Sequence, residues 1–481
     1  MHPVALTRTL RRAARIAAAL LLAACGSDSP APTGAFPAAC HGPLLQNETF
    51  FPNAEVEPFL AVDPADPVHL VGVWQQDRYS GGGAPGLLAG VSFDAGNTWA
   101  SSSAPFSHCT GGSAANGGDY QRASDPWVAI SPDGTAHQLA LTFDVGASGG
   151  HRAILASRST DGGRSWSAAQ TLQGDSDPFF ALDKGSITAD PRNPSLVYAV
   201  WDRLTNQDVS NSPLAHGPAW FARSTDRGVT WEAARNIYDP GADAQTIGNV
   251  IAVLPDGTLL NAMLVLTTVS VTTAIQAELK VLRSVDKGAT WSVPPVTVSP
   301  VHNVTLRDPK TNRPVRTGGG VPSIAVDAST GKVHVVWEDS GDGARNGVAL
   351  ATSADGGLSW SPPVRVNRAP AAPAFTPAVA AGGGKLGVAY YDLRDDVPGD
   401  ASRFLASSWL AVSADGGATW QESALAGPFD LQTAPFALGY FLGDYQGLGW
   451  DGTAFLSFFA AANSGDFSDR TSLLFRRVPA P

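Results

Sequence analysis

Cysteine, methionine and positive charge are all scarce in this chain of 481 residues. It has three Cys and two Met, and its 32 Lys and Arg are outnumbered by 43 Asp and Glu, giving a formal net charge of −11. This acidic balance argues against binding to nucleic-acid phosphates, which requires a basic face. No apolar run reaches the roughly 18 residues of a membrane-spanning helix. With 43% hydrophobic and 16% charged residues, the composition is typical of a globular protein.

Residues 1–24 predict a removable signal peptide. Four basic residues precede the short apolar stretch 16–22: Arg8, Arg11, Arg12 and Arg15. The following Leu22-Ala23-Ala24-Cys25 resembles the lipobox of bacterial lipoproteins, in which the Cys becomes the lipidated first residue. The resemblance implies export and lipid anchoring at Cys25 to the cell envelope, at the outer membrane or cell surface. Residues 25–43 would then be the lipidated Cys and a flexible tether. An ordinary secretory signal with an accidental Cys is the alternative.

The two remaining cysteines form an even pair in an exporting compartment. We expect a Cys40–Cys109 disulfide that joins the start of the fold to the first repeat. Two isolated Cys without companion His make a poor zinc site, and we expect no metal and no cofactor. One acidic loop could gather around calcium, although a solvated loop is the favoured interpretation; its residues are Asp392, Asp395, Asp396 and Asp400.

One pattern, Ser-x-Asp-x-Gly-x-Ser/Thr-Trp, occurs six times at intervals of 60 to 69 residues. The copies begin at Ser92, Ser159, Ser224, Ser284, Ser353 and Ser413. The Asp carboxylate can accept backbone N–H bonds across a turn, the Gly supplies a positive φ, and the Trp can bury its ring between sheets. We therefore expect these segments, called Ser-x-Asp turns below, to be folding elements without chemistry. They resemble the Asp box of sialidases and related propellers.

A pair of predicted strands precedes each Ser-x-Asp turn, and a seventh pair follows the last turn. The pairs begin at Glu57, Asp125, Gly185, Gly248, Val321, Thr376 and Asp444. With a third strand before the turn and a fourth after its Trp, each unit makes a four-stranded blade. The predicted fold is an all-β propeller, one domain over 44–481, with seven blades or, alternatively, six. The last unit has only three strands, and we expect residues 43–51 to supply the fourth.

Polar residues recur at one end of these strands. At the starts of first strands stand Glu57, Asp125, Asp183 and Asp444 with Tyr445. At the ends of second strands stand Asp77-Arg78, Asp144, Asp202-Arg203, Glu338-Asp339, Asp392 and Arg394. Because the strands are antiparallel, both sets should lie on one rim, opposite the Ser-x-Asp turns. We expect an active site there. Alternatively, these groups hold neighbouring blades in register.

From about residue 45 to 478 the chain resembles the sialidase (BNR-repeat) superfamily, whose members use a Tyr nucleophile paired with Glu, an Asp acid/base and an Arg triad. The resemblance implies Tyr445 as nucleophile, Glu338 as its partner and Asp125 as acid/base, with Asp77 and Asp144 as competitors. Substrate binding would fall to Arg78, Arg122, Arg394, Asp77 and Asp392. The chain departs from the family at its aromatic-Arg-Ile-Pro motif, because Val56-Glu57-Pro58 stands in that place.

Paired carboxylates suit glycoside hydrolysis, and clustered Arg suits an acidic sugar. The leading hypothesis is an envelope-anchored, sialidase-like glycosidase that acts on terminal, possibly acidic, sugars. The alternative is a non-catalytic propeller that binds a glycan or an envelope protein through the same rim. The expected partners are a glycan and, through the lipid anchor alone, a membrane; no nucleic-acid partner is expected, and the chain should be a monomer.

Overall fold

The computed structural model describes residues 31–37, 40–146, 150–205, 216–270, 273–341 and 343–481. Cys25 and the predicted signal peptide lie outside the described residues. Helical segments within these ranges include three short 3-10 turns: η1 (His108–Thr110), η2 (Ala114–Asn116) and η4 (Leu431–Thr433). None of the described helices is long and apolar enough to cross a membrane. The described chain is therefore built almost entirely from strands.

Apart from two short strands, the strands of the described residues fall in chain order into six groups of four and one group of three, and the first and last groups share one seven-stranded sheet. The first three groups are β1 (Phe50–Val62), β2 (Leu70–Tyr79), β3 (Gly86–Ser92), β4 (Ala100–Ser102); β5 (Arg122–Ile130), β6 (Ala136–Phe143), β7 (Arg152–Ser159), β8 (Gln170–Asp175); and β9 (Phe180–Ala189), β10 (Val197–Thr205), β11 (Ala219–Ser224), β12 (Arg235–Tyr238). The next two are β13 (Ala244–Val253), β14 (Leu259–Ser270), β15 (Thr273–Ser284), β16 (Val296–Val301); and β18 (Ser323–Val326), β19 (Val333–Asp339), β20 (Gly347–Ser353), β21 (Val364–Arg365). The last two are β22 (Ala374–Gly382), β23 (Lys385–Asp392), β24 (Leu405–Ser413), β25 (Gln421–Asp430); and β27 (Gly447–Trp450), β28 (Ala454–Ala462), β29 (Thr471–Pro479).

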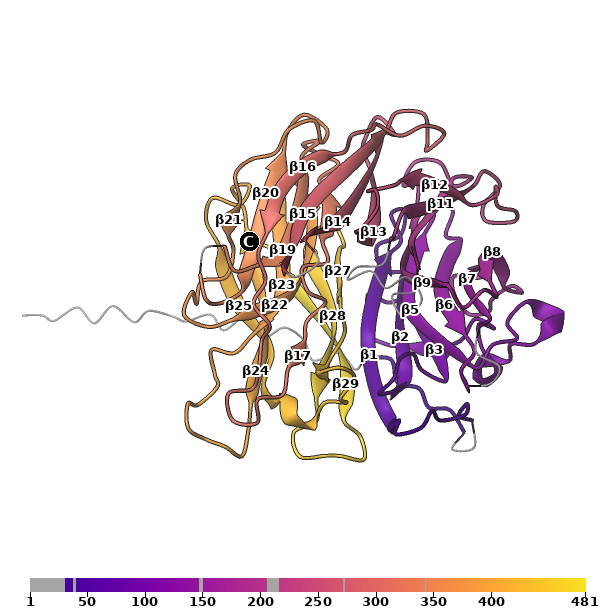
Figure 1. Cartoon of the computed structure of the whole chain (residues 1–481). Helices are drawn as coiled ribbons and strands as arrows, with labels where there is room; N and C mark the ends of the chain where they lie inside the picture. The colour runs from indigo at the N-terminus through magenta and orange to yellow at the C-terminus, as the bar shows by residue number, and fades with distance from the viewer. Residues whose placement is uncertain (1–30, 38–39, 147–149, 206–215, 271–272, 342) are drawn as a thin grey trace, which may run out of the picture.

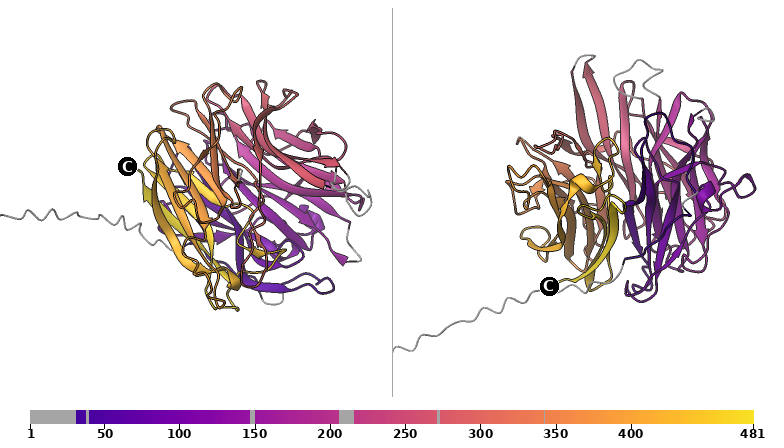
Figure 2. Two further views of the ribbon diagram at one scale, coloured as in Figure 1. Left: turned by 60° about the vertical axis from the view of Figure 1, so that its left-hand side comes forward. Right: turned by 90° about the horizontal axis from the view of Figure 1, so that it is seen from below.

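The groups follow one another around the molecule in chain order (Figures 1 and 2). Each first strand contacts the first strand of the next group, from β1 to β27, and β27 contacts β1 again. Neighbouring strands within a group are antiparallel, whereas the short β17 (Val315–Arg316) and β26 (Tyr440–Phe441) pair in parallel outside the groups. The arrangement is that of a β-propeller, in which the first strands surround the centre.

The closure between the last and first groups differs from the sequence expectation. Residues 43–51 do not add a fourth strand beside β29. Phe50 and Phe51 instead begin β1 and pair with Tyr79 and Arg78 of β2. β29 reaches β1 through a single parallel bridge, Ala54 to Thr471. The long β1 is therefore the first strand of its own group and also contacts β29, the last strand of the final group.

All six Ser-x-Asp turns share one hydrogen-bond pattern between the third and fourth strands of a group. In the second copy, Ser159 Oγ donates to Asp161 Oδ1 at 2.7 Å, and Ser165 donates to Asp161 through N at 2.9 Å and through Oγ at 2.6 Å. These bonds outweigh the effect of burial and lower the pKa of Asp161 to about 2. The Trp of each turn packs against a hydrophobic cluster. The turns thus join strands and fill the space between sheets.

The segment before β1 lies against the first group. Cys40 and Cys109 form a disulfide, with their Cα atoms 5.6 Å apart. Within residues 31–37, predicted to be flexible tether, Pro32 is buried and Ser101 Oγ donates to the Thr33 carbonyl at 2.6 Å. A Cβ on Gly90 would stand only 2.3 Å from Pro32 Cβ, so glycine allows this close approach. This part of the tether is therefore packed on the fold.

Candidate functional site

A bulge recurs in the first strand of five groups and directs one residue toward the centre. At each bulge the pairing with the second strand shifts register at a residue with positive φ. These residues are Glu57 (53°), Asp125 (52°), Lys184 (46°), Gly248 (68°) and Thr376 (49°). A bulge re-aims side chains that an even strand would place alternately on its two faces. Four of the five are not glycine, so the fold maintains a backbone conformation that such residues seldom adopt.

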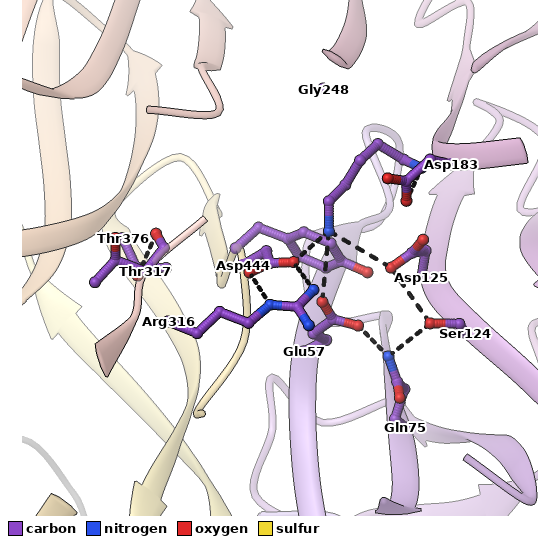
Figure 3. A network of polar contacts seen from close by, with 12 residues as sticks. Glu57, Gln75, Ser124, Asp125, Asp183, Gly248, Arg316, Thr317, Thr376 and Asp444 are labelled. Carbon is purple, nitrogen blue, oxygen red and sulfur yellow. Dashed lines mark hydrogen bonds and ion pairs between the residues drawn. The ribbon is translucent and has the colours of Figure 1, made fainter. Parts of the chain in front are cut away.

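Lys184 lies at the centre of the resulting charge cluster. Figure 3 shows Glu57, Asp125, Arg316 and Asp444 of this cluster close together. Lys184 Nζ donates to Asp444 and lies 3.8 Å from both Glu57 Oε1 and Asp125 Oδ1. Arg316, on β17, donates two hydrogen bonds to the same Asp444 carboxylate, from Nε at 2.9 Å and from Nη2 at 2.5 Å. Five separate parts of the chain thus meet at one point: β1, β5, β9, β17 and the segment after β26 that carries Asp444.

Burial and neighbouring charges affect the acidic residues of this cluster differently: Asp444 stays ionised, whereas Glu57 keeps its proton to a higher pH. Burial alone would raise the pKa of Asp444, but Lys184 and Arg316 hold it well below its usual range. Burial alone would lower the pKa of Lys184, but Asp444, Asp125 and Glu57 raise it. For Glu57, burial and then Asp125 raise the pKa to about 8. Asp444 and Lys184 are therefore a permanent ion pair, and Glu57 is predominantly protonated at neutral pH.

A pocket of about 430 Å³ opens beside the cluster. Its charged lining consists of Asp183, Lys184, Arg316, Glu338 and Asp444. Its uncharged polar lining includes Asn303, Thr305, Thr317 and Asn346. A concave site in which a few polar groups converge is the usual form of a small-ligand site.

Two carboxyl groups on the pocket wall have unequal surroundings. Glu338, at the end of β19, accepts a 2.5 Å bond from Asn346 Nδ2 on Oε1, while its buried Oε2 has no partner among the described residues. Burial raises the pKa of Glu338 to about 8. Asp183, on β9, is partly exposed, and burial of its carboxyl group, opposed by Lys184, raises its pKa to about 6. At neutral pH Glu338 can give a proton and Asp183 can take one.

Tyr445 is not a partner of Glu338. Its hydroxyl donates to the carbonyl of Pro126 at 3.1 Å, and its ring packs edge-on against Trp127. Burial and the carboxylates of Glu57, Asp125 and Asp444 raise the pKa of the phenol well above 10. The structure thus places Tyr445 near Asp125, but it does not activate the phenol as a nucleophile.

Arg78 is the one predicted substrate-binding residue that belongs to the charge cluster. It is buried, donates to Gln75 Oε1 at 2.7 Å and lies over the Phe441 ring at 4.9 Å. Its neighbour Asp77 points elsewhere, because its Oδ1 accepts a 2.8 Å bond from the backbone N–H of Asn53. Asp77 therefore supports the β1 backbone and does not line the pocket.

Arg122, a predicted substrate-binding residue, instead makes structural contacts with the segment before β1. Its Nη1 and Nη2 each donate to Glu48 at 2.7 Å, and Nη2 also donates to the Pro43 carbonyl at 2.8 Å. The guanidinium, fully buried, lies 3.8 Å from the centre of the Tyr79 ring. Arg122 thus fastens the segment before β1 to the first two groups.

Arg394 and Asp392 pair with each other, away from the pocket lining. Arg394 Nε donates to Asp392 at 2.6 Å and Nη1 donates to Glu422 at 2.9 Å, while the guanidinium covers the Trp409 ring.

In the part of the chain that the structure describes, no cluster of three or more His, Cys, Asp or Glu side chains could hold a metal ion.

Lys184 and Arg316 are the site residues that the sequence analysis missed. Lys184 occupies the same repeat position as Glu57 and Asp125, because each stands three residues before a buried apolar residue of its strand, namely Leu60, Val128 and Ile187. The polar residue predicted for this strand is instead the preceding Asp183. An alignment of the repeat units at this position would have identified Lys184. Arg316 lies on β17, outside the repeat, so no periodic signal marks it.

Comparison with known proteins identifies a fold and no family. No protein-family model matches the chain, and no curated protein matches it. Among solved structures, an ulvan lyase bound to -[GlcA(1-4)Rha3S]- is 12% identical, with a TM-score of 0.51 over 90% of this chain and 96% of its own. A Hadza microbial sialidase is 16% identical (TM-score 0.47; 86% and 74% covered), and an alpha-L-arabinofuranosidase of Fusarium graminearum is 14% identical (0.47; 71% and 91%). The chain thus shares the overall propeller fold of the lyase.

Proposed function

We propose that this chain is a glycoside hydrolase, built as a seven-bladed propeller, that binds a terminal sugar in the pocket beside Lys184. The observation that carries the proposal is the pair of pocket carboxyl groups with separated pKa values, about 8 for Glu338 and about 6 for Asp183. Such a pair can supply the acid and the base that cleavage of a glycosidic bond requires. Sugar as the ligand class accords with the saccharide bound to the ulvan lyase of similar fold.

In the proposed reaction Glu338 is the general acid. Its proton passes to the glycosidic oxygen while the bond between that oxygen and the anomeric carbon breaks. Water adds to the anomeric carbon and gives its proton to Asp183, so that the products together contain one added water. Asp444, with both oxygens engaged by Lys184 and Arg316, is a poor base and instead keeps these cations in place.

We further propose that the protein is exported and anchored at Cys25. The Cys40–Cys109 disulfide supports an oxidising compartment, because disulfides are rare in the cytosol. Replacement of Cys25 by Ser should abolish labelling by a radioactive fatty acid and release the protein from the membrane fraction. Retention of the label in Cys25→Ser would disprove this anchor.

A non-catalytic glycan-binding propeller is the second candidate. The observation in its favour is that Lys184, Asp444 and Arg316 already bond to each other, as groups that hold blades in register would. Binding of a sugar without turnover of any glycoside would support this candidate.

The test is hydrolysis of a panel of fluorogenic glycosides by the wild-type chain and by Glu338→Gln. The panel should include arabinosides, galactosides, rhamnosides, glucuronides and α-sialosides. We expect turnover of at least one member and a loss of about 10²-fold or more in kcat for Glu338→Gln. The matched control is Glu55→Gln, because Glu55 is also a buried carboxyl group but bonds to the Leu473 backbone outside the pocket. Equal turnover in Glu338→Gln would refute the assigned acid.

A further inference from the structure

The pocket combines an excess of carboxyl groups with cations that are already engaged. Asp183, Glu338 and Asp444 line it against Lys184 and Arg316. Lys184 and two of the three guanidinium nitrogens of Arg316 bond to Asp444. An anionic ligand would therefore have to compete with Asp444 for both cations.

Two further acidic side chains lie close to Lys184 without lining the pocket. Glu57 Oε1 and Asp125 Oδ1 are each 3.8 Å from its Nζ, and neither residue is part of the pocket lining. Glu57 is 1% exposed and Asp125 is 4% exposed, so water screens these groups little. The three cations of the cluster, Lys184, Arg316 and Arg78, stand against Asp125, Asp183 and Asp444. The charges of the cluster thus nearly cancel, and little net positive potential remains for a ligand.

The remaining polar lining suits hydroxyl groups. Glu338, 1% exposed, presents an Oε2 without a partner among the described residues. Asn303, Thr305 and Thr317 add uncharged donors and acceptors to the wall. A buried polar atom without a partner is costly, and a ligand hydroxyl within hydrogen-bonding distance would remove that cost.

From this charge balance we infer that the pocket is selective for neutral sugars and rejects sugars that carry a carboxylate. The inference rests on the proposed function for the location of the sugar, and it names the substrate class. Asp444 is its specificity-determining residue, since Asp444 occupies both cations that could otherwise receive a sugar carboxylate.

Pairs of sugars that differ only in this carboxylate test the inference. Binding of glucose against glucuronate and of galactose against galacturonate can be measured by ligand-observed NMR titration at neutral pH. We expect the neutral member of at least one pair to bind, and its acidic counterpart to bind at least about tenfold more weakly. Equal or tighter binding of the uronates would overturn the inference, and so would the absence of binding by all four sugars.

Two variants extend the test to the mechanism of rejection. Asp444→Asn frees Lys184 and Arg316, and we expect it to raise uronate affinity by about tenfold or more. The control Asp66→Asn removes the same charge from an exposed turn residue and should leave binding unchanged. Near-ultraviolet circular dichroism shows whether Asp444→Asn still folds. If it does not fold, binding of the neutral and acidic sugars to the wild-type chain is the test of the selectivity. No gain of uronate binding in folded Asp444→Asn would refute the role of Asp444.

The binding assay also separates this inference from the proposed function. Neutral sugars that bind, together with a glycoside panel that shows no turnover, would refute the hydrolase and leave the selectivity intact. Turnover of a glucuronide or sialoside in preference to neutral glycosides would leave a hydrolase and refute the selectivity.

Discussion

Glu338 and Tyr445 illustrate how differently the fold treats two residues that the sequence would pair. Glu338 reaches the pocket with one oxygen unpartnered, whereas the Tyr445 hydroxyl is committed to the Pro126 carbonyl. The resemblance to sialidases identified both as polar residues near the central channel. It could not reveal their partners, because Asn346 and Pro126 come to lie beside Glu338 and Tyr445 only in the folded chain.

Replacement of Tyr445 by Phe therefore tests whether the Tyr445 hydroxyl takes part in catalysis. The change removes one buried hydrogen bond and no reacting group, so we expect a loss of about 1 kcal/mol in stability and less than about threefold in kcat/KM. Chemical denaturation and steady-state kinetics on the best glycoside measure the two effects. A loss of kcat comparable with that of Glu338→Gln would restore Tyr445 as a catalytic residue.

At the scale of the element, the strands and turns could be predicted while the bulges could not. Alternating apolar residues and the Ser-x-Asp pattern predict each group and the position of its Trp. A bulge adds only one residue to a strand and leaves no composition signal. The shift at Glu57 and its counterparts nevertheless decides which side chains meet at the centre.

The Ser-x-Asp turn offers a test that is independent of function. Asp161→Ala removes the acceptor for the Ser165 N–H and for two hydroxyls, so we expect a loss of about 1 kcal/mol or more in stability. Hydrolysis should be unchanged, because the turn lies between β7 and β8, outside the pocket lining. Denaturant titration measures the first effect. A selective loss of activity at unchanged stability would mean that these turns do more than support the fold.

At the scale of the whole molecule, closure of the ring depends on segments that lie outside the repeat. The β17–β26 pair delivers Arg316 to the centre, and the segment before β1 is held by Arg122 and the disulfide. The sequence predicted the ring and its Cys pair. It did not predict these irregular segments, since long-range contacts determine their course.

Buried carboxyl groups should also govern how stability depends on pH. Burial raises the pKa of Glu55 to about 7 and that of Glu57 to about 8, so the folded state holds their protons more tightly than the unfolded chain. Stability should therefore fall as the pH rises from about 5 to about 8. Glu55→Gln should reduce this slope. Differential scanning calorimetry across this range measures Tm; a Tm that rises with pH, or a slope unaffected by Glu55→Gln, would contradict the assignment.

The pH dependence of glycoside hydrolysis shows whether Glu338 and Asp183 act as acid and base. With Asp183 ionised above about pH 6 and Glu338 protonated below about pH 8, kcat/KM of the wild-type chain should follow a bell with limbs near these values. Glu338→Gln should retain the acidic limb, lose the alkaline limb and turn over far more slowly. A wild-type profile without an alkaline limb, or the same alkaline limb in Glu338→Gln, would show that Glu338 is not the acid and that the pocket does not work as described.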